Sequence, residues 1–509
     1  MNATLPRVHP TVVHMLAEAA ARRGQAPALV CGGQRLDYDG YVTAVAAFAA
    51  ELETRGARGA RVATLLPNSI DACIAAFAVL AAGAQHVPLN PLYTQRELTQ
   101  ILEDASPAVL VIDEGLLDAG APAAAAAGVP HRVILGRATR RLDVPARRST
   151  IPSMPHPGQL ALLQYTGGTT GRPKGVNLTH AAIAVNVSQR EGLLPTRPDV
   201  ERVLCVMPLF HSYAMAMGLF LAAYCRGCLV VLERYQPERL LETIAGERIT
   251  IFPGSPTLFV GLMAHADFAR SDWSSVHTCY SGAAPLAEET LRRWCRVVPA
   301  PVYEGYGQTE AGPVLSFNPV GGPIKPGSVG VPVADTVLEV VDVETGTRVL
   351  PAGERGEIRA HGPQLMQGYR NRPEETAQAL RDGWLYTGDI GEFDADGYLY
   401  VRDRKKDMVI VGGYNVYPRE VEEVLCTHPA IAEAAVVGAP DAYRGEILRA
   451  YAVLRAGATA TAADLLAHCA ANLAKYKVPA TLELLAALPK TSVSKTDKQA
   501  LRARARGAA

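Results

Sequence analysis

A loop rich in glycine, threonine and lysine is the first stretch of this sequence that could hold phosphates. It reads QYTGGTTGRPKG (164–175). Backbone N–H groups can crowd around an anion only where side chains are small, which suits the glycines to that task. Threonine hydroxyls add hydrogen-bond donors, and a lysine adds a mobile positive charge. We therefore expect phosphate contacts from Thr166, Gly167, Gly168, Thr169, Thr170, Gly171 and Lys174.

The spacing of this loop differs from two common nucleotide-binding motifs. A Walker loop places lysine and then serine or threonine directly after its last glycine, whereas Arg172 and Pro173 separate Gly171 from Lys174 here. The dinucleotide fingerprint does not fit either. The alternative interpretation is a flexible Gly/Thr loop without function, which the density of donors disfavours.

Four further stretches contain residues that could act with such a loop: YEGYGQTEAG (303–312), WLYTGDIG (384–391), VRDRKKDMVIVGGYNVYP (401–418) and LPKTSVSKTDKQ (488–499). Glu310 offers the kind of carboxylate that binds Mg2+ together with phosphate oxygens. Asp389 is expected in a tight glycine turn at the end of a strand, where it and Arg404 could bind ribose hydroxyls. Each residue alone also has a structural interpretation: Glu310 at a helix N-terminus, Asp389 as a turn former, Lys495 as a surface lysine.

The ordered set YTGGTTGRPKG, YGQTEAG, YTGD, DRKKD and PKTSVSK resembles the adenylate-forming superfamily of acyl-CoA synthetases, luciferases and peptide-synthetase adenylation domains. The resemblance runs from about residue 36 to residue 502. It implies that the phosphates are those of ATP and that pyrophosphate is the leaving group. The implied reaction converts a carboxylic acid to an acyl-adenylate and then transfers the acyl group to CoA.

The resemblance also implies roles for single residues. For ATP and AMP it implies residues 166–171 and Lys174 on the β- and γ-phosphates, Gly282, Ala283 and Ala284 beside the adenine, Tyr306 stacked on it, and Asp389 and Arg404 on the ribose. Glu310 and Thr170 would hold Mg2+, and Thr309 would contact phosphate. Lys495 would bridge the attacking carboxylate and the α-phosphate, where its charge stabilises the transition state more than the ground state.

The acid is expected to lie against MPLFHSYAMAMG (207–218). The resemblance places His211, Ser212 and Tyr213 in that pocket and counts His211 among the catalytic residues. HSYAM, SGAAPL and TEAGPVL resemble 4-coumarate–CoA ligases, whereas QYTGGTTG and DRKKDMVIVGGYNVYP look like bacterial long-chain fatty-acid–CoA ligases. Tyr213 could donate a hydrogen bond to a ring substituent or could be a packed aromatic side chain. Both a fatty and an aryl acid stay open at this point.

Two poses of a mobile C-terminal domain are implied as well. Lys406 matches the hinge position, and the second pose would bring Gly412, Gly413 and Tyr414 to a tunnel for the pantetheine arm of CoA. Ser494 departs from the family pattern, in which glycine precedes the catalytic lysine. Since no carrier domain follows in the sequence, CoA is the expected acceptor. Alternatives are transfer of an unusual activated acid to an amine, or a binding module without catalysis.

Length and composition limit the classes of protein. The chain has 509 residues, 49% of them hydrophobic, with 50 basic and 50 acidic side chains, so it exceeds one core and offers no polyanion-binding surface. We expect no nucleic-acid partner. No apolar run is long enough to span a membrane and no signal-peptide core is present, which predicts a cytoplasmic protein. Expected partners are a small carboxylic acid, ATP, CoA and a second copy of the chain in a homodimer.

The elements that must position these residues follow an α/β pattern. A strand over 59–68 precedes a helix over 69–83 that Ser69 could cap, and apolar strands are predicted at 108–113, 228–233 and 249–256. This predicts helices covering mostly parallel sheets. Residues 336–362 alternate and turn at 344–346, which indicates an antiparallel, barrel-like segment.

A smaller α+β domain is predicted after DRKKD (403–407), with a helix, two strands and a helix at 418–426, 432–438, 448–455 and 462–472. The predicted domains are therefore residues 1–403, which bind acid and ATP, and residues 404–509, a mobile lid that carries Lys495. Among the nine cysteines only Cys225 and Cys228 are close together. We expect them to be buried thiols beside a strand and not metal ligands.

Overall fold

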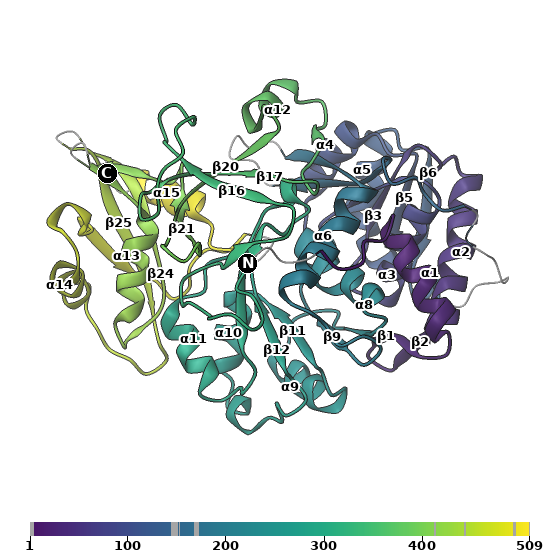
Figure 1. The fold of residues 1–509 in the computed structure, drawn as a ribbon, viewed down its shortest axis with the longest axis horizontal. Coiled ribbons are helices and arrows are strands. Elements are labelled where there is room, and N and C mark those ends of the chain that lie inside the picture. Colours follow the sequence, from purple (N-terminus) through teal and green to yellow (C-terminus); the bar gives the residue numbers. More distant parts are fainter. Residues whose placement is uncertain are drawn as a thin grey trace.

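The computed structural model describes residues 5–143, 151, 153–166, 173–411, 414–441, 444–491 and 495–507. The predictions that lie outside these residues are those for Gly167, Gly168, Thr169, Thr170, Gly171, Gly412, Gly413 and Ser494. Figure 1 shows two large helix-covered sheets at the right and bottom, an antiparallel sheet at the upper centre, and the C-terminal elements at the left.

The larger sheet is mostly parallel. Its order is β15 (Val331–Pro332), β14 (Ser316–Phe317), β13 (Val302–Tyr306), β12 (Thr278–Ser281), β11 (Ile251–Gly254), β9 (Arg202–Cys205), β10 (Cys228–Val231), β1 (Pro27–Cys31) and β2 (Gln34–Asp37). The neighbours from β13 through β1 run parallel, and antiparallel strands close both edges. Parallel strands need both faces covered, which explains why most residues of these strands are apolar.

A second sheet has the order β18 (Gly368–Tyr369), β8 (Lys174–Thr179), β7 (Leu160–Thr166), β4 (Gln85–Pro88), β3 (Arg61–Leu65), β5 (Val109–Asp113) and β6 (His131–Leu135). The strands from β7 to β6 are parallel neighbours, and β8 pairs antiparallel with β7. The predicted strands 59–68, 108–113, 228–233 and 249–256 correspond to β3, β5, β10 and β11. The predicted α/β class is confirmed.

Helices connect and cover these strands. Those of the first 300 residues that the structure describes are α1 (Val12–Arg23), α2 (Tyr38–Thr54), α3 (Ile70–Ala81), α4 (Gln95–Ala105), α5 (Leu117–Ala126), α6 (His180–Leu193), α7 (Ser212–Ala214), α8 (Leu221–Tyr224), α9 (Pro237–Gly246), α10 (Pro256–Met263) and α11 (Glu288–Cys295). The predicted cap of α3 is confirmed, since the Ala72 N–H donates to Ser69 Oγ at 3.1 Å.

The antiparallel segment continues the chain. It contains β16 (Val337–Val341), β17 (Gly356–His361), β20 (Trp384–Phe393), β19 (Leu380–Arg381) and β21 (Leu399–Arg404), with α12 (Pro373–Ala379) before β19. The prediction that Asp389 lies in a turn ending a strand is wrong. Strand β20 runs through Asp389, which pairs with Arg404 of β21 just before a register shift. Gly388 has φ +70°, so the chain bends there without leaving the sheet.

Residues 404–509 are called the C-terminal region below. Their sheet has the order β23 (Tyr414–Val416), β22 (Val409–Val411), β25 (Gly445–Leu454) and β24 (Ile431–Asp441), with β26 (Thr481–Leu484) paired to β25. Helices α13 (Pro418–Thr427), α14 (Ala462–Asn472) and α15 (Lys498–Gly507) accompany it. The helices and strands predicted here therefore form as α13, β24, β25 and α14. The division of the chain at residues 403 and 404 stays a prediction.

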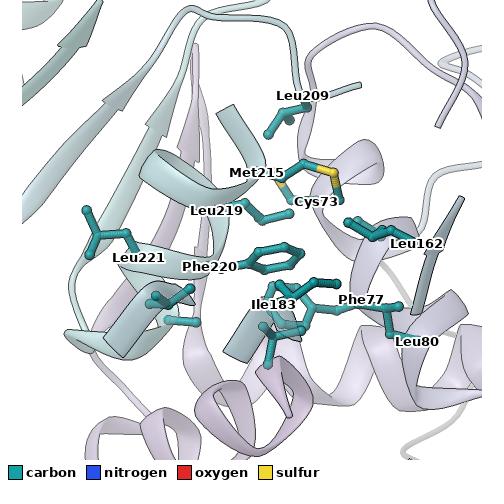
Figure 2. Close-up of a cluster of buried hydrophobic side chains, with 14 of the residues drawn as sticks. Cys73, Phe77, Leu80, Leu162, Ile183, Leu209, Met215, Leu219, Phe220 and Leu221 are labelled. Atoms are coloured by element: carbon teal, nitrogen blue, oxygen red, sulfur yellow. The ribbon is translucent and has the colours of Figure 1, made fainter. Parts of the chain in front are cut away.

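One hydrophobic core lies between the two large sheets and includes the chain just after the HSY motif. A π-helical stretch, Met215–Phe220, follows α7 directly. Figure 2 shows Phe220 of this stretch among Phe77 and Ile183, which come from α3 and α6. The Phe77 and Phe220 rings meet edge to face with centroids 5.7 Å apart. The backbone that carries His211 is therefore anchored from behind.

Cys225 and Cys228 are both buried, and Cys228 begins β10, as expected for thiols beside a strand. Within the described ranges, no helix combines the length and apolar character needed to cross a membrane.

Candidate active site

The described ends of the phosphate loop lie side by side. Thr166 ends β7, Lys174 begins β8, and the two residues are paired across the hairpin. The Lys174 ammonium lies 5.1 Å from the centroid of the Tyr369 ring, and the Tyr369 hydroxyl donates to Glu310 Oε1 at 2.9 Å. Burial raises the pKa of the Glu310 carboxyl, and the Tyr369 bond opposes that rise. Lys174, at the described end of the loop, and the predicted metal ligand therefore share one corner of the site.

A second group of predicted residues meets where β13 ends. The Tyr306 hydroxyl donates to Asp389 Oδ2 at 2.6 Å, and Arg404 Nε lies 3.4 Å from Asp389 Oδ1. Burial raises the pKa of Asp389, while Arg404 acts in the opposite direction. Thr309 follows in the same segment, and its hydroxyl lies 3.3 Å from that of Ser212. The residues predicted for base and ribose are thus in contact with one another, and the Thr309 predicted for phosphate contacts Ser212 of the predicted acid pocket.

Lys495 of the C-terminal region reaches a small pocket in the rest of the chain. The pocket is lined by Met207, Pro208, His211, Ser255, Thr257, Ala283, Ala284 and Lys495. Burial and then Arg404 lower the pKa of Lys495 to about 8, against the opposing effect of Asp389. At pH 7 the ammonium form therefore predominates. Residues from the predicted acid pocket, adenine site and lid are brought together here.

His211 is neutral at pH 7, since burial and then Lys495 lower its pKa to about 3. Its Nδ1 accepts a hydrogen bond from the Tyr213 N–H at 3.2 Å, so the ring proton lies on Nε2. The ring can therefore orient a polar group as a donor. It cannot supply a positive charge.

Tyr213 is packed inside the predicted acid pocket. Its hydroxyl donates to the carbonyls of Gly254 and Tyr280, at 3.3 and 3.5 Å. A Cβ placed on Gly282 would lie only 2.7 Å from Tyr213 Cε2, so the ring lies directly on that glycine. In this structure Tyr213 is a packed aromatic side chain whose hydroxyl is hydrogen-bonded to main-chain carbonyls.

The residues predicted for hinge and tunnel lie elsewhere. Lys406 is exposed, just after β21. Tyr414 is 59% exposed and stacks on Tyr476 with ring centroids 4.6 Å apart. It does not line the pocket that Lys495 lines. The structure therefore holds the C-terminal region with its lysine side, and not Tyr414, toward the pocket.

Sequence reasoning missed residues that support the site. Asn68 donates to the Met207 and Leu232 carbonyls at 3.1 and 3.2 Å and accepts from the Leu209 N–H at 2.8 Å, which fixes the chain before His211. Gln164 donates to the Phe210 carbonyl from the other side. Asn68 is the last residue of the strand predicted over 59–68, and a polar residue at that position is a signal of a possible site residue. Tyr369 has no comparable local signal.

Comparisons with known proteins agree with this arrangement. The family model for AMP-binding enzymes matches residues 16–370, and the model for the C-terminal domain of these enzymes matches residues 420–495. A long-chain-fatty-acid–CoA ligase of Bacillus subtilis (strain 168) is 37% identical over 96% of this chain and 94% of its own. A feruloyl-CoA synthase of an Amycolatopsis species is 38% identical over 93% of this chain and 94% of its own.

Among solved structures, the amide bond synthetase McbA from Marinactinospora thermotolerans superposes with a TM-score of 0.88 and 30% identity, covering 97% of this chain and 99% of its own. Family models and relatives of this extent leave no large part of the chain unmatched. The chain therefore belongs to the AMP-binding enzyme family, and within it to the adenylate-forming acid–CoA ligases.

Proposed function

We propose that this protein activates a carboxylic acid with ATP and then transfers the acyl group to the thiol of CoA. The observation that carries the proposal is Lys495, a residue of the C-terminal region that lines one pocket with His211, Ala283 and Ala284. A lysine in such a position meets both the acid and the α-phosphate if ATP lies along the SGAAP strand end. Family membership supports the same chemistry.

In the first step, a carboxylate oxygen of the acid forms a bond to the α-phosphorus, and the bond to the pyrophosphate oxygen breaks. Negative charge builds on the α-phosphoryl oxygens as this happens. Lys495 carries its charge at pH 7, because its pKa is about 8. The neutral His211 can donate from Nε2 to the acid. This displacement is favoured by the positive charge of Lys495 beside the α-phosphate and by the neutral His211 as a hydrogen-bond donor to the acid.

The remaining residues fit ATP with Mg2+. Tyr306 offers a half-buried ring, and Asp389 with Arg404 offers a carboxylate and a guanidinium for vicinal hydroxyls. Glu310 provides a carboxylate near Lys174, the type of ligand that Mg2+ prefers beside phosphates. When bound, the ion neutralises charge on the phosphates. Thr170, the second proposed ligand, lies outside the described residues.

We propose a compact acid of the aryl type as the substrate. Tyr213 fills the space beside Gly282, and its hydroxyl is bonded to two carbonyls, so the ring is fixed where we propose that it blocks a long chain. The relative named feruloyl-CoA synthase supports an aryl acid. The relative named long-chain-fatty-acid–CoA ligase supports a fatty acid, which would need Tyr213 to move.

Transfer to CoA in the second step would use another pose of the C-terminal region. We propose that Lys406 is the hinge, and that rotation brings Tyr414 and its loop to the pocket in place of Lys495. The exposed position of Tyr414 in the present pose is consistent with that movement. The thiolate sulfur of CoA would form a bond to the acyl carbon, and the bond to AMP would break.

A second candidate function has an amine in place of CoA. It is favoured by the likeness to an amide bond synthetase over nearly the whole chain. The first step and its residues would be the same, and only the acceptor would differ.

The test is pyrophosphate release over a panel of aryl, short-chain and long-chain acids, each with CoA, with a panel of amines, or with neither. Acyl-CoA and amide products are identified by mass. We expect the highest kcat/KM with an aryl acid, and turnover only when CoA is present. A higher kcat/KM with a long-chain acid contradicts the compact pocket. Turnover with an amine and not with CoA contradicts the proposed acceptor.

A further inference from the structure

Glu304 is a buried carboxyl group beside the site that the steps above do not use. It lies in β13, two residues before Tyr306, and is 5% exposed. Its Oε1 accepts a hydrogen bond from the Leu286 N–H at 2.9 Å. Leu286 ends the stretch SGAAPL (281–286), which contributes Ala283 and Ala284 to the pocket. The Glu304 carboxyl therefore attaches the adenine loop (residues 281–286) to β13.

This attachment matters because the adenine loop has an unfavourable backbone conformation. Ala283 has φ +67°, in the left-handed region where a Cβ is disfavoured. Such a conformation persists only when neighbouring contacts hold it. Glu304 is itself fixed, since its carbonyl accepts from the Asn318 N–H and from Asn318 Nδ2, both at 3.1 Å. The loop is thus held at its far end by a residue with no freedom to move.

The charges that act on Glu304 come from helix α13 of the C-terminal region. They are Arg419, which lowers the pKa of the Glu304 carboxyl, and Glu423, which raises it. Strands β12 and β14 and residues 282–287 contribute no carboxylate, lysine or arginine. Arg419 is buried, and its Nε donates to Glu423 Oε1 at 2.9 Å. The carboxyl group that holds the adenine loop is therefore also subject to the charges of α13.

We propose that Glu304 is a positioning residue for adenylation, which holds the adenine loop through Leu286 and binds a proton when the C-terminal region docks with Lys495 in the pocket. The proposal rests on the proposed function, because it requires that the C-terminal region moves between two poses. Docking brings α13 against Glu304, and a carboxyl group that loses water is more stable when neutral. Docking and protonation therefore favour each other.

The direction of the pH effect follows from burial. In the docked pose burial raises the pKa of Glu304 to about 7, and exposure to water in the other pose lowers it toward the ordinary value. The docked pose is then favoured below the ordinary pKa, and this preference is lost as the pH rises through about 7. Lys495 loses its own charge only near pH 8. Glu304 and Lys495 therefore titrate at different pH values, and their effects on the pH profile can be separated.

The test is single-turnover pyrophosphate release without CoA, from about pH 5.5 to pH 9, with the acid that reacts fastest in the panel. For the wild type we expect a midpoint near pH 7. Glu304→Gln keeps an acceptor for Leu286 but cannot titrate, so its midpoint should move up to about pH 8, where Lys495 titrates. Its rate at pH 6 should stay within about threefold of the wild type.

Two further variants sharpen the test. Glu423→Gln removes the like charge and releases Arg419, so the midpoint should move below the wild-type value, opposite to Glu304→Gln. Glu288→Gln changes an exposed carboxylate of α11 that pairs with Arg292, and it should leave the midpoint unchanged. If Glu304→Gln fails to fold, the test rests on the downward shift of the pH midpoint in Glu423→Gln.

The proposal is overturned if Glu304→Gln and the wild type share one midpoint, or if Glu423→Gln shows no shift. A parallel titration of the full chain with Mg·ATP alone contains neither acid nor CoA. We expect ATP affinity to fall above pH 7 in the wild type and to stay level up to pH 8 in Glu304→Gln. This measurement reports on Glu304 even if the proposed acid or acceptor is wrong, and equal pH dependence of both proteins in it overturns the proposal.

Discussion

The two sides of the pocket are held in different ways. On the N-terminal side, the buried Asn68 makes hydrogen bonds to Met207 and Leu209, in the chain before His211, and Phe220 anchors the chain behind it. On the other side, the links between the C-terminal region and the rest of the chain include ion pairs, such as Arg355 with Glu420 at 3.7 Å. Ion pairs at a surface contribute about 1 kcal/mol or less. One side is therefore fixed by buried side chains, and we propose that the other, called the movable side below, is released between the two steps.

The largest effect is expected at Lys495, where the movable side supplies charge to the fixed side. Lys495→Ala should lower the rate of adenylate formation about a hundredfold or more, because the negative charge that builds on the α-phosphate is no longer stabilised by an ammonium group. Transfer to CoA from a supplied acyl-adenylate should be unaffected. The measurement compares the two half-reactions on one preparation.

The matched control for this variant is Lys490→Ala. Lys490 lies in the same segment but pairs with Glu433 at 2.5 Å, away from the pocket. It should change neither half-reaction by more than about twofold, as is usual for a surface pair. Equal loss of both half-reactions in Lys495→Ala would indicate a folding defect and contradict the assigned role.

The second prediction tests whether the movable side moves about Lys406. Proline fixes φ near −65°, so Lys406→Pro should hold the pose in which Lys495 lines the pocket. One turnover of pyrophosphate release should survive, whereas thioester formation should fall about a hundredfold. Lys406→Ala, which keeps the backbone free, is the control and should resemble the wild type. If Lys406→Pro reduces both steps alike, or neither, rotation about this residue is wrong.

The third prediction concerns the fixed side. Asn68→Ala leaves the Leu209 N–H and the Met207 carbonyl without their buried partner, at a cost of about 1–3 kcal/mol each. We expect a lower midpoint in urea unfolding and a KM for the acid about tenfold higher, with the Kd for Mg·ATP little changed. Asn68→Asp keeps the acceptor and should lose less. A larger change in ATP affinity than in acid KM would show that the wall before His211 is not the acid side.

Much of the fold could be predicted because the signals are local. The strand Arg61–Leu65 and the helix Ile70–Ala81 follow from an apolar run, a cap at Ser69 and helical spacing. Gly388 and Gly391 on either side of Asp389 predict a turn, yet the pairing of Asp389 with Arg404 continues the strand. That pairing depends on a segment about fifteen residues away, which local pattern does not report.

The site shows the same limit. The order of motifs predicts site roles for Lys495, Glu310 and Asp389, and those roles stay predictions. Glu304 and Tyr369 have ordinary sequence surroundings, and their importance lies in partners such as Leu286 and Glu310 that only the tertiary structure supplies. A residue that positions others through buried hydrogen bonds has no spacing of its own to recognise.

The smallest effect is expected at Arg355, and it tests the comparison directly. Its Nη1 lies 3.7 Å from Glu420 Oε2 of α13, its Nε donates to Glu392 at 2.8 Å, and its guanidinium lies 5.7 Å from the Tyr417 ring centroid. Because Glu420 also pairs with Lys477 at 2.6 Å, loss of Arg355 leaves that carboxylate compensated. Arg355→Met should change the ratio of adenylation to transfer by less than about threefold. The assay is repeated in 0.5 M salt, where surface charges are screened over about 4 Å. The difference in this ratio between Arg355→Met and the wild type should then become smaller still. A tenfold or larger change that persists in salt would mean that this contact holds the C-terminal region in place, and the movable side would then be as firmly built as the fixed one.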